Sequence, residues 1–278
     1  MPASRRSVEH LLAEVAALRS EAATLREELA NAERSILTQR LFLPNGEGRR
    51  ESSPVESLAP TREPRELSDC LEKLDELAPH AFPIWRELLD VNADTYLDFP
   101  IHSCSVEGHP MAEMFRCFLK PYLGGAVLDV GCGPQPVPYY LLDYPVERMA
   151  GVDPLPPAAP HPFVFVHGVA EFLPWEDQTF SVVVVGTSLD HVLLLDRALG
   201  EIRRVLKPDG HLVTWVSFIP GAARYDPYSP DVQKVDDYHL FHFDRPWFED
   251  LLGVHFIAEE HFSFPHPEFS RFYSFLRR

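Results

Sequence analysis

One nonapeptide constrains the fold of this chain more than any other stretch, the run Ala-Val-Leu-Asp-Val-Gly-Cys-Gly-Pro from Ala126 to Pro134. Its apolar part predicts a short buried parallel strand, which stops at the Gly-Cys-Gly turn. Glycine permits a tight turn and lets a ligand approach the backbone, because no Cβ stands in the way. Ligands of open α/β sheets bind at the carboxyl ends of the strands. The stretch therefore predicts an α/β fold with a ligand site directly after this strand.

The proline content of the turn argues against a dinucleotide ligand. A dinucleotide-binding turn has the pattern Gly-x-Gly-x-x-Gly, and its third glycine lets the following helix pack closely. Pro136 takes the place of that glycine here, between Pro134 and Pro138. This arrangement disfavours a pyrophosphate cradle and, with it, a nicotinamide-dependent enzyme.

Further elements follow in the order of a doubly wound sheet. Asp153 ends a second apolar strand about 20 residues after the glycine turn, where such folds place the carboxylate that holds ribose hydroxyls. A helix with basic residues in its last turn stops at Pro208-Asp209-Gly210. The expected strands are Met149–Asp153, Phe163–His167, Ser181–Val185, His211–Val216, Val254–Glu260 and Arg271–Leu276. The stretch Ala198–Gly210 is expected to close a helix, and a second helix is expected to begin, after an Asp244 cap, at Arg245.

In these motifs the sequence resembles the class I S-adenosylmethionine-dependent methyltransferases, over roughly Leu123 to Arg278. The motifs that carry the resemblance are VLDVGCGP, GVD, AEFLPWEDQTFSVVVV and EIRRVLKPDG. The resemblance implies a seven-stranded, mostly parallel sheet with helices on both faces and an antiparallel last strand. It also implies S-adenosylmethionine as the cofactor and methyl transfer as the reaction, whereas the motifs do not name the acceptor.

The resemblance implies roles for the residues around the glycine turn. Gly131, Cys132 and Gly133 would lie against the methionine part of the donor. Asp129 would hold its ammonium group directly or through water. Asp153 would accept hydrogen bonds from both ribose hydroxyls, since a carboxylate has two acceptor oxygens.

The adenine side departs from the family pattern. The pattern often has Asp-Ala before Glu, whereas this chain has Val169-Ala170-Glu171, so the usual carboxylate for the adenine amino group is missing. The Ala170 backbone, Glu171 or Phe172 would serve instead. Gly186, at the end of the fourth strand, completes the predicted donor site.

Two histidines are candidates for a general base. A hydroxyl acceptor needs a group that takes its proton. His239 lies in a segment that resembles the His-containing stretch of sugar and other small-molecule methyltransferases, and it is the first candidate. His191, in the loop after the fourth strand, is the second, and a loop-fixing role is favoured for it.

Several of the residues near His239 are also metal-ligand types. Asp190, Asp236, Asp237, His239 and His242 have the side chains that a divalent site uses. Nothing in their spacing requires an ion, so no metal ligand is assigned.

Charge and cysteine usage limit the partners and the compartment. The formal net charge is −17, and an acidic body repels the phosphates of nucleic acids. The four cysteines form no Cys-x-x-Cys pair, and no apolar run approaches the ~20 residues of a membrane span. We expect a cytoplasmic protein with a small-molecule or glycan acceptor and no nucleic-acid partner.

The N-terminal region carries a heptad pattern. Apolar residues at 8–36 recur in steps of three and four, with valine at a and leucine at d in the first repeats, which favours a parallel two-stranded coiled coil. The alternatives are a single helix that folds back on the body and a helix that binds another partner. We expect a coiled-coil helix at 1–43, a flexible linker at 44–66 and a methyltransferase domain at 67–278 with a helical cap at 67–122.

Two functions from different classes remain. The first is methyl transfer to a hydroxyl or amine of a small polar acceptor, such as a sugar, a glycan or a natural product, by a homodimer. The second is a non-catalytic, methyltransferase-like scaffold that acts through its coiled coil. The retained glycines and Asp153 argue for the enzyme.

Overall fold

The structure is a computed structural model, and it describes residues 58–157, 159–263 and 270–278. The chain divides into two units, Met1–Glu51 and Ser52–Arg278. The predicted coiled coil and the first part of the predicted linker lie outside the described residues, so both stay predictions. All of the described residues belong to the second unit.

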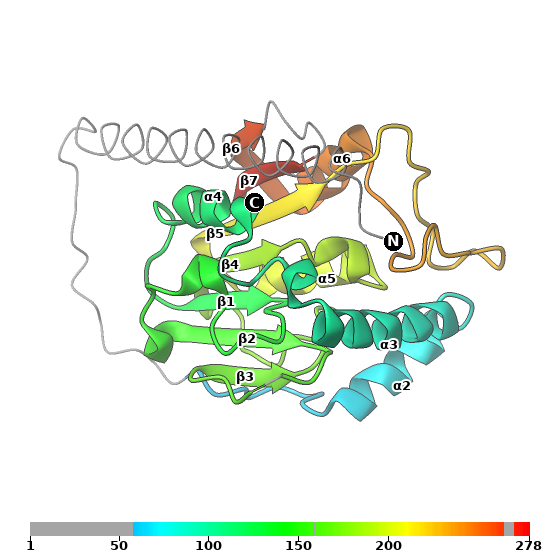
Figure 1. Ribbon diagram of the computed structural model, residues 1–278, viewed down its shortest axis with the longest axis horizontal. Helices are drawn as coiled ribbons and strands as arrows, with labels where there is room; N and C mark the ends of the chain where they lie inside the picture. The colour runs from blue at the N-terminus through cyan, green and yellow to red at the C-terminus, as the bar shows by residue number, and fades with distance from the viewer. Residues whose placement is uncertain (1–57, 158, 264–269) are drawn as a thin grey trace, which may run out of the picture. The chain divides into compact units, whose positions relative to one another are not determined.

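A seven-stranded sheet runs through this unit in the order β3-β2-β1-β4-β5-β7-β6 (Figure 1). Strands β1 to β5 are parallel to one another, whereas β7 pairs antiparallel with both β5 and β6. The predicted seven-stranded sheet with an antiparallel last strand is therefore confirmed. The strands span Val127–Val130 (β1), Met149–Asp153 (β2), Val164–His167 (β3), Phe180–Gly186 (β4), Leu206–Ser217 (β5), Phe256–Ser263 (β6) and Ser270–Arg277 (β7).

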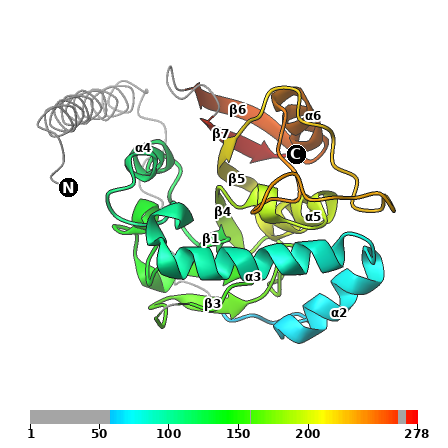
Figure 2. The same ribbon diagram turned by 45° about the vertical axis from the view of Figure 1, so that its right-hand side comes forward.

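Helices cover both faces of the sheet, because the central strands bury apolar side chains on both sides. Leu128 and Val130 pack in the core formed with α2, α3, α5 and α6, whereas Val127 packs in the core formed with α4. This alternation follows from the two-residue period of a strand. Figure 2 shows α4 and α5 on opposite sides of β4 and β5. The helices span Leu67–Leu77 (α2), Phe82–Asp98 (α3), Pro110–Leu119 (α4), Leu195–Val205 (α5) and Arg245–His255 (α6).

The connection from β1 to β2 contains no α-helix in residues 131–148, all of which the structure describes. Its only helical pieces are the 3₁₀ turns Tyr139–Leu141 and Val146–Arg148. Pro134, Pro136 and Pro138 crowd the first half, and proline both lacks an N–H and clashes with a preceding helical turn. The glycine turn therefore has no helix N-terminus behind it on which a pyrophosphate would rest.

Strand β5 begins earlier than the sequence predicts. Helix α5 starts at Leu195, and β5 already starts at Leu206 and runs through the Pro-Asp-Gly stop. Leu206 pairs with Phe180 and His211 with Val182, so the register shifts between these pairs. Such an irregularity accommodates extra residues in one strand. The Pro-Asp-Gly segment therefore follows the end of α5 and still lies within β5.

The last helix begins at the predicted cap residue, but its side chain is used differently. Asp244 occupies the N-cap position of α6 and makes no side-chain bond to the helix. Its Oδ1 accepts a hydrogen bond from the Gly221 N–H at 3.1 Å instead. The carboxylate therefore fixes the loop after β5 rather than the helix end.

Residues 58–66, at the end of the predicted linker, are attached to the body. Leu58 is buried, and its carbonyl accepts a hydrogen bond from the Trp175 indole N–H at 2.8 Å. The Thr61 and Arg62 N–H groups donate to the Pro174 carbonyl at 2.8 and 3.0 Å. This part of the stretch is therefore held in place, not free to move independently.

None of the four cysteines forms a disulfide in the structure. Cys70, Cys117 and Cys132 are buried, and Cys104 is partly buried. Within the described residues, no helix combines the length and the apolar composition that crossing a membrane requires.

Candidate active site

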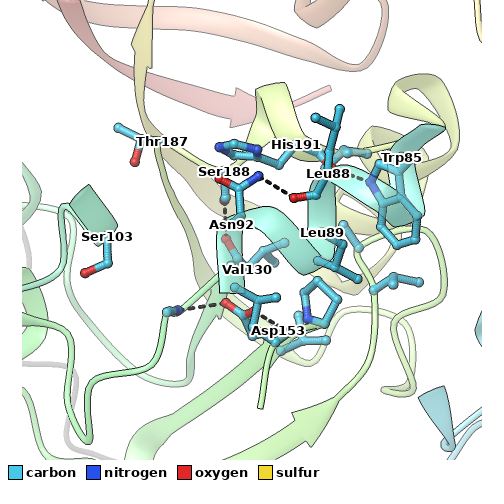
Figure 3. Close-up of a pocket in the computed structure, with 18 of the residues that line it drawn as sticks. Trp85, Leu88, Leu89, Asn92, Ser103, Val130, Asp153, Thr187, Ser188 and His191 are labelled. Atoms are coloured by element: carbon cyan, nitrogen blue, oxygen red, sulfur yellow. Dashed lines mark hydrogen bonds between the residues drawn. The ribbon is translucent and has the colours of Figure 1, made fainter. Parts of the chain in front are cut away.

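A cleft lies at the carboxyl ends of β1, β2 and β4, the edge of the sheet at which the sequence predicts a ligand (Figure 3). The space within it, part of which is open to solvent, is about 900 Å³, and its lining is mainly apolar. Small-molecule and cofactor sites have the same mainly apolar character. The lining includes seven of the predicted site residues: Gly131, Gly133, Asp153, Ala170, Glu171, Gly186 and His191.

Asp153 joins the glycine turn to the end of β2. Its Oδ2 accepts a hydrogen bond from the Gly133 N–H at 2.8 Å, and its Oδ1 accepts one from the Leu155 N–H at 2.8 Å. Burial raises the pKa of this carboxyl to about 6, although the two hydrogen bonds oppose the rise. The carboxylate is therefore fixed in orientation at the cleft and lies directly beside the glycine turn.

The two glycines of the turn occupy positions that other residues do not fit. Gly131 and Gly133 have φ angles of +75° and +73°. A Cβ on Gly131 would lie 2.3 Å from the Ser188 Cβ, and a Cβ on Gly133 would lie 3.0 Å from the Ser105 Oγ. Ser188 is held there because its hydroxyl donates to the Val130 carbonyl at 2.7 Å. The turn thus forms a cradle of bare backbone that any side chain would fill.

Asp129 and Cys132 lie beneath the cleft and do not contribute to its lining. Both are fully buried, on the face of the sheet that packs against α4. The Asp129 carboxylate accepts a hydrogen bond from the Tyr140 hydroxyl at 3.0 Å, and burial raises its pKa to about 8. The Cys132 side chain packs beside Gly151, where an added Cβ would meet its Sγ at 2.9 Å. The contacts with the donor that the sequence predicts for Asp129 and Cys132 stay predictions.

Glu171 holds the start of α5. Its Oε1 accepts hydrogen bonds from the Leu193 and Leu194 N–H groups, both at 2.9 Å, and burial raises its pKa. The carboxylate is thus already engaged, although Glu171 lines the cleft together with Ala170. The predicted adenine contacts of Ala170 and Glu171 stay predictions. A contact through the Ala170 backbone would not compete with the hydrogen bonds that the Glu171 carboxylate already makes.

Helix α3 supplies a wall of the cleft, in the region for which the sequence predicts only a helical cap. The Trp85 indole N–H donates to the His191 carbonyl at 2.7 Å, and the Asn92 amide donates to the Tyr238 carbonyl at 3.0 Å. These bonds tie the helix to the loops that carry the candidate bases. The sequence signal for this wall is helical spacing, since the α3 lining residues are Trp85, Leu88, Leu89, Asn92 and Tyr96.

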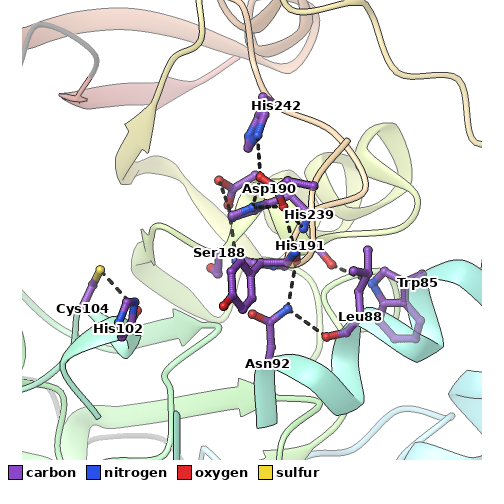
Figure 4. Close-up of polar contacts among 12 residues, drawn as sticks. Trp85, Leu88, Asn92, His102, Cys104, Ser188, Asp190, His191, His239 and His242 are labelled. Atoms are coloured by element: carbon purple, nitrogen blue, oxygen red, sulfur yellow. Dashed lines mark hydrogen bonds and ion pairs between the residues drawn. The ribbon is translucent and has the colours of Figure 1, made fainter. Parts of the chain in front are cut away.

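The two candidate bases stack on each other (Figure 4). The His191 and His239 rings have centroids 4.7 Å apart at an angle of 28°, and His191 lines the cleft whereas His239 lies behind it. His239 Nδ1 is 3.0 Å from Asp236 Oδ1, and its Nε2 is 4.0 Å from Asp190 Oδ2. Burial lowers the pKa of His191 to about 4 and also lowers that of His239. Both imidazoles are therefore neutral near pH 7, and the burial that keeps His191 neutral also makes it a weak base.

Residues 128–214 match the methyltransferase domain family. This match runs from β1 to β5 and so contains the glycine turn, Asp153 and His191. A probable methyltransferase of Aspergillus luteorubrus, ltbC, is 33% identical to this chain over 126 residues. The match covers 37% of this chain and 44% of that protein.

A second kind of relative has a different named reaction. The human mitochondrial arginine-hydroxylase NDUFAF5 is 37% identical over 89 residues, which cover 30% of this chain and 26% of that protein. The matched segments thus span less than half the length of these curated relatives.

A solved structure supports the fold over most of the chain. The 1,6-didemethyltoxoflavin-N1-methyltransferase of Burkholderia thailandensis, which was solved with S-adenosylhomocysteine bound, superposes with a TM-score of 0.52. It is 17% identical, and the match covers 82% of this chain and 99% of that one. Residues 128–214 are therefore similar to a methyltransferase domain, and the sheet has the fold of the Burkholderia enzyme.

Proposed function

We propose that this protein transfers a methyl group from S-adenosylmethionine to a hydroxyl or amine of a small polar acceptor. The observation that carries the proposal is the hydrogen bond between the Gly133 N–H and the Asp153 carboxylate. It joins the backbone cradle to the acceptor of ribose hydroxyls at one cleft, which is the arrangement that an adenosyl ligand needs.

The residues of the cleft fit this cofactor. Gly131 and Gly133 give the methionine part room against the backbone, and Asp153 offers two fixed oxygens to the ribose. Bound there, S-adenosylmethionine supplies a methyl group that its sulfonium already activates. The chain then has to align the acceptor and exclude water, and the mainly apolar wall of α3 serves both needs.

A hydroxyl acceptor would also require a base at the cleft. His191 lines the cleft, and this position supports a base role, although burial lowers its pKa to about 4 and so weakens it as a base. His239 lies directly behind it and is oriented by Asp236. His239 remains the first candidate from the sequence and His191 the second, and an amine acceptor would place less demand on either.

One named relative supports a small-molecule acceptor. The Burkholderia enzyme is named as the N1-methyltransferase of 1,6-didemethyltoxoflavin, whereas the name of ltbC gives no acceptor. Sugars and glycans are included because the segment around His239 resembles that of sugar methyltransferases. Natural products are included because the same segment resembles that of other small-molecule methyltransferases.

Calorimetry with the tag-free chain tests the proposal, followed by a screen of acceptors that is read by product mass. We expect one S-adenosylmethionine to bind per chain, and a product that is heavier by one CH₂ with a sugar nucleotide, glycan or polyketide-like acceptor. An absence of heat with the donor would instead indicate the non-catalytic scaffold.

We also propose that residues 8–36 pair two chains in the cytoplasm, a compartment with which four cysteines that form no disulfide are consistent. Light scattering should give twice the chain mass for the full-length protein and the single-chain mass for a variant that lacks residues 1–43. Monomers in both samples would contradict the pairing.

A further inference from the structure

A second cluster of polar side chains lies behind His191, on the side away from the glycine turn. Asp236, His239 and His242 each place one side-chain donor atom within 4.8 Å of the others. In the part of the chain that the structure describes, this is the only group of three or more such side chains arranged in this way. Figure 4 shows His242 and His239 gathered beside Asp190 and His191.

The distances within the cluster match those between neighbouring ligands of one ion. His242 Nε2 is 2.9 Å from Asp236 Oδ2, and His239 Nδ1 is 3.0 Å from Asp236 Oδ1. Ligands that each bind an ion at about 2.1 Å lie roughly 3.0 to 3.4 Å apart in octahedral or tetrahedral geometry. Both imidazoles thus reach the same carboxylate at a spacing that one cation can bridge.

The backbone fixes the carboxylate at the centre of this cluster. The N–H groups of Tyr238 and His239 donate to Asp236 Oδ1 at 2.8 and 2.7 Å. Such outer hydrogen bonds orient the ligands of metal sites. The side chains of His239 and His242 are about one quarter exposed, so solvent can occupy further coordination positions. The formal charge of −17 also favours cations near this body.

We propose that Asp236, His239 and His242 bind a divalent first-row transition-metal ion. Two imidazoles with one carboxylate suit zinc, iron or cobalt, whereas Mg²⁺ and Ca²⁺ prefer oxygen ligands. Three protein ligands leave positions open, as in sites whose metal binds a further molecule. This inference rests on the geometry of segment 236–242, and it stands whether or not the chain binds S-adenosylmethionine.

An ion bound by this cluster would give the two stacked histidines, His191 and His239, different roles. It takes His239 Nδ1, so that His239 serves as a ligand, and His191 is left as the base that lines the cleft. The ion lies one ring away from the cleft wall, because the His191 and His239 rings are 4.7 Å apart. No metal ligand is assigned from the sequence alone, because the spacing Asp-x-x-His-x-x-His in an irregular segment does not by itself require a metal ion.

The test uses the full, tag-free chain and measures metal directly. The chain is stripped with a chelator, dialysed against Co²⁺ or Zn²⁺ and then against buffer, and its metal content and Co²⁺ absorption are recorded. We expect about one ion per chain, with the visible bands of Co²⁺ bound by nitrogen and oxygen. A tenfold excess of Mg²⁺ should not displace it.

Variants connect the ion to the cluster. His242→Asn and Asp236→Asn should each weaken binding at least tenfold, since each removes a ligand. His255→Asn is the matched control, because His255 pairs with the single carboxylate of Asp196 at 3.0 Å. Thermal unfolding confirms that each variant is folded. Less than stoichiometric binding, displacement by Mg²⁺, or equal binding by His242→Asn, Asp236→Asn and the native chain would overturn the proposal.

Discussion

Replacement of Asp153 with alanine should weaken the binding of S-adenosylmethionine at least tenfold. The carboxylate would accept hydrogen bonds from both ribose hydroxyls, and its loss leaves both of them unpaired in a buried cleft. Each such group costs about 1–3 kcal/mol, and 1.4 kcal/mol corresponds to a factor of ten. Calorimetric titration of the native and the variant chain gives the ratio of dissociation constants.

Two further variants separate this role from a loss of folding. Asp153→Asn keeps one acceptor oxygen and should fall between the native chain and alanine. Asp143→Ala removes an exposed carboxylate that pairs with Arg116 on the surface, and it should leave the affinity unchanged. An alanine variant at position 153 that is folded and binds the donor with native affinity would refute the assignment.

The pH dependence of binding provides an independent check on the same residue. The pKa of Asp153 is raised to about 6, so the carboxyl is mostly ionised at pH 7 and mostly protonated at pH 5. Only the ionised form accepts from both hydroxyls, and affinity should fall about tenfold from pH 7 to pH 5. The raised pKa has the opposite effect on folding, because its contribution to stability is lost as the pH rises through 6. The fall in affinity should be much smaller in Asp153→Asn.

Gly131→Ala should lower the free energy of unfolding by about 3 kcal/mol and abolish donor binding at micromolar concentrations. An alanine at φ +75° is strained by about 1–2 kcal/mol, and its Cβ would lie 2.3 Å from the Ser188 Cβ. Relief of that overlap requires the loop after β4 to move, which typically costs a further 1–3 kcal/mol. Urea unfolding measures the total.

A double-mutant cycle divides that cost between overlap and backbone strain. In a Ser188→Gly background the overlapping side-chain atoms are gone, so the cost of Gly131→Ala should shrink to roughly the 1–2 kcal/mol of the φ angle. Gly200→Ala is the control, because a Cβ there meets nothing within 4 Å and the residue lies inside α5. It should stabilise the chain by about 0.5–1 kcal/mol. An unchanged cost in the Ser188→Gly background would show that contact with the Ser188 side chain does not cause the loss of stability.

The sheet was largely predictable because its signals are local. Apolar runs that end in Asp153 and Gly186 mark buried parallel strands, and β2 begins and ends at the predicted residues. The exact start of α5 was not predictable, because it depends on a contact between distant residues. Glu171 accepts from the Leu193 and Leu194 N–H groups across 22 and 23 residues, and no pattern near Leu195 encodes that bond.

The candidate site was predictable where it depends on backbone freedom. Positive φ angles at Gly131 and Gly133 require glycine, so the cradle is visible in the sequence. The placement of Asp129 was not, because the side of the strand that a residue faces depends on which helices cover the sheet. The arrangement of Asp236 and His242 was equally hidden, since an irregular segment has no period from which side-chain directions follow.

The proline-rich connection after Gly133 also determines which nucleotides the cradle tolerates. A row of amide dipoles aimed at the ligand would stabilise the two negative charges of a diphosphate, and here that row is absent from residues 134–138. A diphosphate would lose its hydration shell in this cleft and would be repelled by the negative charge of the Asp153 carboxylate. A sulfonium meets an attraction at the same place. The connection therefore acts as a filter on ligand charge, and ATP or NAD should compete poorly with a cationic adenosyl compound for this cleft.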